Sequence, residues 1–257
     1  MGFSPDWLAL REPVDHASRD AALLAQTVAA AGQETLVLDL GSGTGSTARA
    51  FAGHAPAAWG WRFVDGDAAL LQIAGEKHPQ SEQVLFDLGN IADLPLDGVG
   101  LVTASALLDL MPRDWVDALA ARLSAAKIPF YAAINYNGQM RWSPASPDDA
   151  GVTAAFNQHQ RSDKGIGAAL GPISADETAQ IFAAHGFDVH RGDSPWQLGA
   201  DDTALHDELI AGIGAAAAEA GYKDALTWAE MRRRTVAQTT GYIGHTDILA
   251  IPHLTGE

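Results

Sequence analysis

The amino-acid sequence predicts an α/β protein built on a doubly wound, mostly parallel sheet. Two observations lead to this fold class. A short apolar run breaks into a glycine-rich turn and resumes as a helix-compatible segment, LVLDLGSGTGSTAR, over Leu36–Arg49. Strand-like apolar runs then alternate with helical segments, without a linker, a low-complexity tract or an internal repeat. We therefore expect one domain over residues 1–257, and the hydrophobic fraction of 47% is ample for its core.

The first strand is expected at Leu36–Leu40, after an amphipathic helix over Asp15–Ala30. This run is short and apolar except for Asp39, which is typical of a buried parallel strand. Three alternating glycines follow it: Gly41, Gly43 and Gly45. Glycine allows positive φ and lets a ligand approach the backbone without a Cβ in the way, so this turn is the expected ligand site.

An acidic residue follows the second predicted strand, Trp61–Val64. This residue is Asp65, twenty positions after Gly45, where doubly wound folds present a carboxylate to ribose hydroxyls. We therefore expect a cofactor that contains adenosine. The dinucleotide fingerprint G-x-G-x-x-G/A requires glycine or alanine where this chain has Ser46, and this mismatch argues against NAD.

The segment Leu36–Arg49 strongly resembles motif I of the class I S-adenosylmethionine-dependent methyltransferases, (V/L)-L-D-x-G-x-G-x-G. Later segments resemble this family in order: the second strand with its acid (Phe63–Asp65), the helix after it (Ala69–Ala74), the adenine-lining segment (Gly89–Pro95), the fourth strand (Leu101–Leu108), the fifth strand (Ile128–Asn135), the last crossover helix with the sixth strand (Ile181–Val189), and the seventh strand (Thr246–Ile251). The family's usual Asp in the adenine-lining segment is Asn90 here, an amide in place of a carboxylate.

The resemblance implies a Rossmann-like, seven-stranded sheet of order 3-2-1-4-5-7-6, with the seventh strand antiparallel and with helical insertions. It also implies S-adenosyl-L-methionine as cofactor and S-adenosyl-L-homocysteine as product. The cofactor-binding residues expected from it are Asp39, Gly41, Ser42, Gly43, Gly45, Asp65, Gly66, Asn90, Ile91 and Ser105.

Composition excludes several classes of partner. The formal net charge of −16 repels nucleic acid and anionic membranes, and the one short basic cluster, Arg232–Arg234, is expected on a helix face. The chain has no cysteine and its nine histidines lack metal-binding spacing, so no metal is expected. There is no apolar signal core at the N-terminus and no run approaching the roughly 20 apolar residues of a membrane span. We expect a cytoplasmic, soluble monomer or homodimer.

Three regions exceed a minimal core and are expected to select the substrate: an N-terminal cap of about residues 1–14 and insertions of about 139–173 and 197–240. The N-terminal cap often folds over the cofactor in the resembled family. Trp7 and Arg11 in this cap are expected to bind substrate, with an amphipathic helix packed on the core as the alternative. Trp196 either walls the acceptor pocket or packs in the interior.

Polar residues near the expected cleft are candidates for catalysis and acceptor binding. Asp109 follows the fourth strand, where it either faces the acceptor or caps the helix that starts near Pro112. Asn135 and Tyr136 end the predicted fifth strand, either at the cleft or as ordinary turn residues.

His159 and Asp163 are four residues apart, so on a helix the carboxylate would orient the imidazole as a general base. Lys164 beside them is a candidate for acceptor binding. A solvated helix face is the alternative for this group.

The predicted function is direct methyl transfer to a small-molecule acceptor, with oxygen or nitrogen as the accepting atom. The cofactor's sulfonium is already activated, so the chain needs chiefly to align the acceptor and accept a proton. One alternative is an NAD(P)-dependent oxidoreductase, against which the absent Tyr-x-x-x-Lys pair also counts. A non-catalytic cofactor-binding protein of the same fold is the other.

Overall fold

A computed structural model describes residues 3–253 of the chain. Two residues of the predicted N-terminal cap, 1–2, and the last four of the predicted domain, 254–257, lie outside the described residues. The strands in the described part are β1 (Leu36–Leu40), β2 (Gly60–Asp65), β3 (Glu82–Leu85), β4 (Val99–Ser105), β5 (Phe130–Ser143), β6 (Phe187–Asp193), β7 (Trp196–Leu198) and β8 (Thr240–Pro252).

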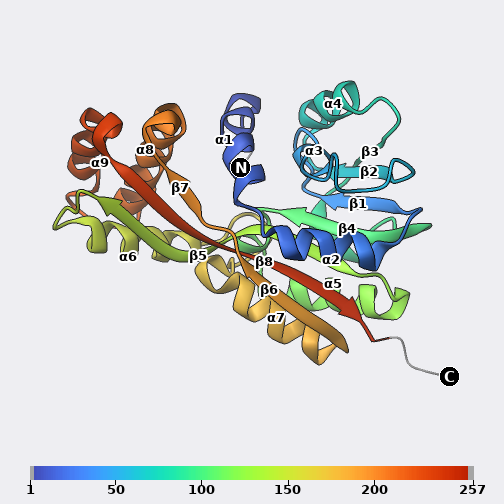
Figure 1. Ribbon diagram of the computed structural model, residues 1–257. Coiled ribbons are helices and arrows are strands. Elements are labelled where there is room, and N and C mark those ends of the chain that lie inside the picture. Colours follow the sequence, from blue (N-terminus) through green and yellow to red (C-terminus); the bar gives the residue numbers. More distant parts are fainter. Residues whose placement is uncertain (1–2, 254–257) are drawn as a thin grey trace.

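Helices connect and cover these strands (Figure 1). The α-helices are α1 (Pro5–Ser18), α2 (Ala21–Ala31), α3 (Ser46–Ala50), α4 (Ala68–Lys77), α5 (Arg113–Ala126), α6 (Asp149–Gln160), α7 (Ser174–Ala184), α8 (Thr203–Glu219) and α9 (Ala225–Arg234). Short 3-10 turns are η1 (Leu88–Asp93), η2 (Leu108–Leu110), η3 (Gly171–Ile173), η4 (Ala200–Asp202) and η5 (Val236–Gln238).

The strands form one sheet of order β3-β2-β1-β4-β5-β8-β6, with β7 paired to β8 beside this path. The pairings among β1 to β5 are parallel, whereas β8 runs antiparallel to β5, β6 and β7. The predicted Rossmann-like fold is therefore confirmed, with β8 in the place of the expected seventh strand. The expected strand count is wrong: Trp196–Leu198 pairs with Gly241–Ile243 and adds an eighth strand.

Two strands are longer than the sequence predicts. The expected fifth strand ends at Asn135, but β5 continues to Ser143, where it pairs with Thr240 at the start of β8. The two strands form the long ribbon that extends diagonally beneath α8 and α9 in Figure 1. Residues 139–143 therefore belong to the sheet and not to the predicted insertion, and Asn135 and Tyr136 lie within a strand instead of at its end.

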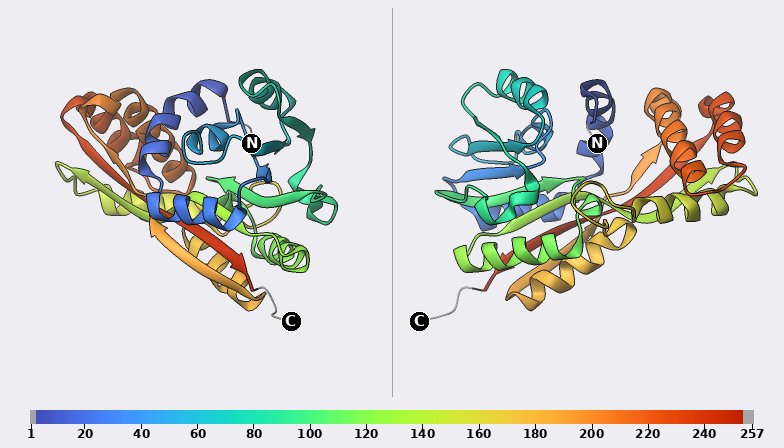
Figure 2. Two further views of the ribbon diagram at one scale, coloured as in Figure 1. Left: turned by 45° about the vertical axis from the view of Figure 1, so that its right-hand side comes forward. Right: turned by 180° about the vertical axis from the view of Figure 1, so that it is seen from behind.

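The predicted helix Asp15–Ala30 is two helices in the structure, α1 and α2. Asp20 has extended backbone angles and its Oδ1 accepts from Leu23 N at 2.8 Å, so it caps the start of α2. The second helix can therefore lie along β8 and β6, while α1 lies between the α8–α9 pair and the α3–α4 side, as Figure 2 shows.

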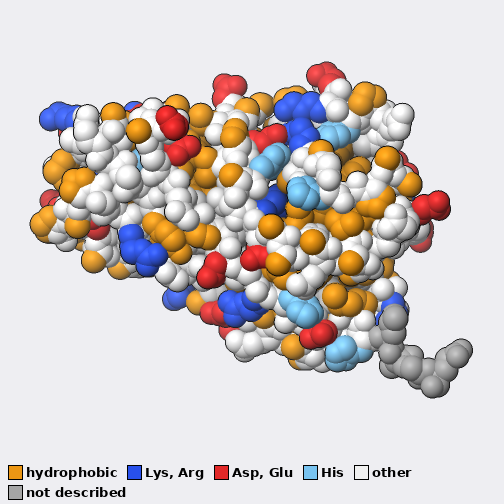
Figure 3. Space-filling view, in the orientation of Figure 1, with side chains coloured by type: hydrophobic (Ala, Val, Ile, Leu, Met, Phe, Trp, Pro, Cys, Tyr) orange, Lys and Arg blue, Asp and Glu red, His pale blue; other side chains and the backbone are white. Residues whose placement is uncertain are grey.

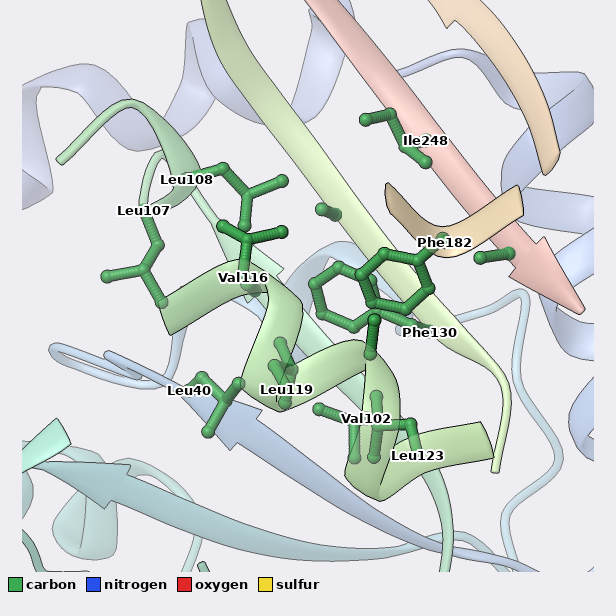
Figure 4. Close-up of a cluster of buried hydrophobic side chains, with 14 of the residues drawn as sticks. Leu40, Val102, Leu107, Leu108, Val116, Leu119, Leu123, Phe130, Phe182 and Ile248 are labelled. Carbon is green, nitrogen blue, oxygen red and sulfur yellow. The ribbon is translucent and has the colours of Figure 1, made fainter. Parts of the chain in front are cut away.

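The core has two parts because successive strand residues point to opposite faces of the sheet. Leu38 and Val102 belong to a buried cluster with α5 and α7, whereas Val37 and Leu101 belong to a second cluster with α2 and α8. Figure 4 shows the first cluster, in which helix residues meet strand residues and two stacked rings: Leu40, Val102, Leu107, Leu108, Val116, Leu119, Leu123, Phe130, Phe182 and Ile248. This packing holds the ends of β1 and β4 in fixed positions.

Among residues 3–253, no helix is long and apolar enough to cross a membrane. In the basic cluster, Arg232 is buried and its Nη2 donates to both carboxylate oxygens of Asp149 at 2.6 Å. Arg233 pairs with Asp207 at 2.7 Å. On the face shown in Figure 3, basic side chains are scattered among acidic ones and do not gather in one patch.

Candidate active site

A cavity of about 640 Å³ opens at the carboxyl ends of β1, β2 and β4. Ligands of open α/β sheets bind at this edge, and a cavity of this volume lies in the range for small-molecule sites. Its lining comes from α1 and the residue Phe3 before it, from the ends of β1, β2 and β4 with the loops and helix starts that follow them, from η1, and from one lysine: Phe3, Leu8, Arg11, Asp15, Gly41, Ser42, Gly43, Thr44, Ser46, Thr47, Asp65, Gly66, Asp67, Ala68, Leu70, Leu88, Ser105, Ala106, Leu107, Leu110, Met111 and Lys164.

The glycine loop adopts the backbone conformation expected for it. Gly41, Gly43 and Gly45 have φ of 60°, 53° and 78°, a region that other residues rarely occupy. A Cβ on Gly43 would lie 3.1 Å from Leu8 Cδ1 of α1, and one on Gly41 would lie 3.2 Å from Leu107 Cδ1. The loop can therefore approach the neighbouring segments closely only because it carries no side chains at these positions.

Asp65 ties the loops after β1 and β2 together. Its Oδ2 accepts from Gly43 N at 2.8 Å and its Oδ1 accepts from Asp67 N at 2.9 Å. A carboxylate offers about four lone-pair directions, so both oxygens keep the capacity to accept from a ligand. Asp65 thus lies where the sequence predicts an acceptor for ribose hydroxyls.

Most expected cofactor residues line this cavity: Gly41, Ser42, Gly43, Asp65, Gly66 and Ser105. Gly45 does not, because it starts α3 behind the loop. Asn90 and Ile91 do not either; Leu88, at the start of the same 3-10 turn, faces the cavity in their place. These assignments as cofactor ligands remain predictions.

Asp39 is buried beneath the loop and does not line the cavity. Its Oδ1 accepts from Thr103 Oγ1 at 2.8 Å, while its Oδ2 has no hydrogen-bond partner among the described residues. Burial raises the pKa of this carboxyl to about 7, against the opposing hydrogen bond from Thr103. Buried Arg19 donates from Nη2 to Ser105 Oγ at 2.9 Å, which fixes that hydroxyl at the cavity wall.

Asp109 lies in η2, away from the N-terminus of α5; it does not line the cavity, but its neighbours in the chain Leu107, Leu110 and Met111 do. The predicted helix cap is wrong, because Pro112 occupies that position without a side-chain hydrogen bond. Asp109 is 8% exposed, and its Oδ1 has no hydrogen-bond partner among the described residues. Burial raises its pKa to about 6, and the positive charges of Arg11 and Lys164 oppose this shift.

Tyr136 lies near Asp109 and is 6% exposed. Burial and the charge of Asp109 raise the pKa of its phenol, whose hydroxyl donates to Asn157 Oδ1 at 2.7 Å. Asn135, also buried, donates from Nδ2 to Thr246 O at 2.9 Å. Neither Asn135 nor Tyr136 lines the cavity.

His159 and Asp163 do not share a helix face, so this prediction is wrong. α6 ends at Gln160, and Asp163 Oδ1 instead accepts from Gly165 N at 2.7 Å and Gly167 N at 3.0 Å. His159 Nε2 is 3.0 Å from Glu219 Oε2 of α8. A catalytic role for either residue remains a prediction, without the pairing on which it was based.

The N-terminal residues divide between the cavity and the interior. Arg11 lines the cavity, where its Nε and Nη2 donate to Asp15 at 2.8 and 3.2 Å. Trp7 packs against the second core cluster instead. Trp196 is 3% exposed and does not line the cavity: its Nε1 donates to Asp15 at 3.0 Å and its ring lies 5.0 Å from Arg11 Cζ.

Sequence reasoning missed two residues near this end of the site. The sequence places Asp15 only in a helix, yet its carboxylate orients Arg11 and accepts a hydrogen bond from Trp196, which is 181 positions away. His245 pairs with Tyr136 across β5 and β8 and lies 5.1 Å from the ring of Trp196. Burial lowers the pKa of His245 to about 3, so the imidazole is neutral. No local pattern marks either residue, because both depend on long-range packing.

Comparison with known proteins agrees with this architecture. Residues 37–127 match the family model described as "Methyltransferase domain". Similar solved structures include a proposed methyltransferase from Bacillus halodurans C-125 (16% identity, 90% of this chain, 96% of that chain, TM-score 0.51). A geranyl diphosphate methyltransferase in complex with S-adenosylmethionine is also similar (13%, 91%, 84%, 0.51). So is the cyclopropane synthase MmaA2 from Mycobacterium tuberculosis (12%, 96%, 94%, 0.53). A search of curated protein sequences finds no significant match.

The resemblance to class I methyltransferases is therefore confirmed, by the family model over residues 37–127 and by the fold over nearly the whole chain. The cofactor expected from the sequence agrees with this family. At 12–16% identity, the solved structures establish the fold and leave the acceptor of this chain to its own residues.

Proposed function

We propose that this chain is an S-adenosylmethionine-dependent methyltransferase that transfers a methyl group directly to oxygen or nitrogen of a small molecule. One observation carries the proposal: a single cavity joins the glycine loop and Asp65 to an end with charged side chains, Arg11, Asp15 and Lys164. The glycine loop suits an adenosine-containing cofactor, and the charged end suits an acceptor. In-line transfer requires that the two bound molecules share one continuous cavity.

The residues at the loop fit this cofactor. Asp65 keeps free acceptor capacity beside a loop whose glycines leave no Cβ between it and Leu8 or Leu107. When bound, the cofactor supplies a methyl group activated by a sulfonium. The chain must then orient the acceptor, exclude water and take up its proton.

We assign Asp109 as the general base that takes up the proton of the acceptor. Its Oδ1 is buried without a hydrogen-bond donor, and a pKa of about 6 leaves it ionised yet basic near neutral pH. Tyr136 beside it stays protonated, because burial and the Asp109 charge raise the pKa of its phenol. The hydrogen bond to Asn157 holds that ring in place. His159 is a second candidate base, less favoured because its Nε2 is occupied by Glu219.

Calorimetric titration tests the cofactor assignment. We expect the purified protein to bind S-adenosylhomocysteine at one site and to show no heat with NADH, the matched control for an oxidoreductase. Competitive binding of NADH at that site, or no binding of S-adenosylhomocysteine, would refute the proposal. Release of S-adenosylhomocysteine from S-adenosylmethionine with a metabolite panel, read by mass spectrometry, separates an enzyme from a non-catalytic binding protein.

A further inference from the structure

Lys164 enters the cavity from a tight loop between α6 and η3, here called the Lys164 loop (residues 162–168). A β-bridge joins Asp163 to Ala168, and Ala169 N donates to Ser162 O at 3.3 Å, so the base of the loop is closed. Gly165 and Gly167 have φ of 107° and 131°, which only glycine adopts without strain. The loop is therefore built to one shape.

Asp163 holds that shape from within. Its Oδ1 accepts from Gly165 N at 2.7 Å and from Gly167 N at 3.0 Å, on either side of the turn. The side chain of Lys164, between Asp163 and the first of these glycines, is directed to the cavity wall. Asp163 is thus a positioning residue for Lys164.

Lys164 is the lining cation that no carboxylate contacts directly in the described part of the chain, although Asp109 is near enough for its charge to act on the lysine. Arg11 is already paired with Asp15, and Asp65 and Asp67 lie at the other end, beside the loop after β2. Within residues 3–253, Lys164 forms no salt bridge; its Nζ donates to His159 O at 3.2 Å and has two further protons to donate. Burial lowers its pKa, while the charges of Asp109 and Glu219 oppose the shift.

We infer that the methyl acceptor is a small organic carboxylic acid whose carboxylate binds Lys164 while its hydroxyl or amino group faces Asp109. This inference rests on the proposed function. A carboxylate would give the half-buried ammonium, which donates to the carbonyl of His159, a charged acceptor as well, and charge-assisted hydrogen bonds of this kind are strong. A phosphate or diphosphate is less suited, because its two or more negative charges would meet only one lining cation without a paired carboxylate, since Arg11 already donates twice to Asp15.

The bound cofactor, the acceptor and Asp109 together account for every bond and proton in the transfer. The acceptor's oxygen or nitrogen forms the bond to the methyl carbon as the carbon–sulfur bond breaks. The electron pair of that bond stays on the sulfur of S-adenosylhomocysteine. The proton of the acceptor passes to Asp109 Oδ1.

The test compares matched acceptors. Initial rates of S-adenosylhomocysteine formation are measured with a panel of hydroxy- and amino-carboxylic acids, each beside its primary amide. We expect kcat/KM for the best acid to exceed that of its amide at least tenfold. Lys164→Met should raise KM for this acid at least tenfold and KM for the amide much less, because the amide oxygen makes only a neutral hydrogen bond, whereas Lys164→Arg should retain most of the preference. Lys223→Met, at an exposed lysine outside the site, is the control.

A second pair of variants tests the loop. Asp163→Ala should raise KM for the acid, with kcat nearly constant, because the two glycine N–H groups lose their acceptor. Asp163→Asn should restore KM, since its amide oxygen still accepts from both. If Asp163 had only a structural role, Asp163→Ala would instead lower Tm and change KM for the acid and for the amide alike.

Three results would overturn the inference: equal use of acid and amide by the wild type, no turnover of any acid by a protein that binds S-adenosylhomocysteine, or weakened S-adenosylhomocysteine binding in Lys164→Met. Weakened S-adenosylhomocysteine binding in Lys164→Met would mean that Lys164 binds the cofactor and not the acceptor. A wild-type protein that does not bind S-adenosylhomocysteine would instead refute the proposed function itself.

Discussion

Replacing Asp65 with alanine should weaken cofactor binding more than it weakens the fold. The carboxylate lies at the end of β2 and accepts one backbone N–H on each oxygen, from Gly43 and from Asp67. Each oxygen keeps about one further lone pair, enough for two neighbouring ribose hydroxyls. Asp65→Ala removes these acceptors and also releases the glycine loop from the loop after β2.

The magnitude follows from the kind of bond lost. A hydrogen bond to a charged group contributes about 1.5–3 kcal/mol, but Asp65 is only half-buried, so solvent replaces part of what is removed. We expect a net loss of about 1–3 kcal/mol in binding free energy, or roughly a 5- to 150-fold rise in Kd. The two freed N–H groups should lower the free energy of unfolding by about 1 kcal/mol.

Calorimetric titration with S-adenosylhomocysteine measures the first quantity, and urea denaturation measures the second. Asp97→Ala, which removes an exposed carboxylate from a different loop, is the control and should leave Kd unchanged. A folded Asp65→Ala protein with a Kd within twofold of the wild type would show that the cofactor does not use this carboxylate.

Further variants test the rest of the site and the fold. Gly43→Val should abolish S-adenosylhomocysteine binding in calorimetry, since φ of 53° strains a β-branched residue; retained affinity would place the cofactor elsewhere. Asp109→Asn should lower kcat by roughly 10²–10⁴, and the wild-type rate should fall as pH drops below about 6, where the carboxyl becomes protonated; a flat pH profile would exclude it as the base. His159→Ala should change kcat less than about threefold, and a hundredfold loss would restore it as the base. Arg232→Met should cost about 3–5 kcal/mol of unfolding free energy in urea by leaving the carboxylate of Asp149 without its cationic partner, and a cost below about 1 kcal/mol would contradict that reasoning.

Local backbone requirements explain what the sequence predicts well. The three glycines between β1 and α3 and the acid at the end of β2 lie as the sequence predicts, because a turn with positive φ and a strand terminus are set by neighbouring residues. The same holds for the alternating elements from β1 to α5. Strand order came from the resemblance, and the observed sheet agrees with it apart from one added strand.

Partners distant in the chain explain what the sequence did not predict. β5 and β8 extend to Ser143 and Thr240 because each supplies the other's hydrogen bonds, and neither strand alone signals that length. His159 was assigned to Asp163 by spacing, yet it meets Glu219, which is 60 positions away.

The end of the cavity lined by Arg11, Asp15 and Lys164 depends most on tertiary structure. Short motifs in the sequence were enough to predict a methyltransferase fold, and they also predict where its cofactor binds. Lys164 lines the cavity, and is not a solvated side chain, because its loop is closed. Asp109 does not cap a helix; it is buried beside Arg11 and Lys164, because α1 and the Lys164 loop both reach the end of β4. Burial and charge act through space, so the chemistry of these groups is set by residues that the chain brings together only when it folds.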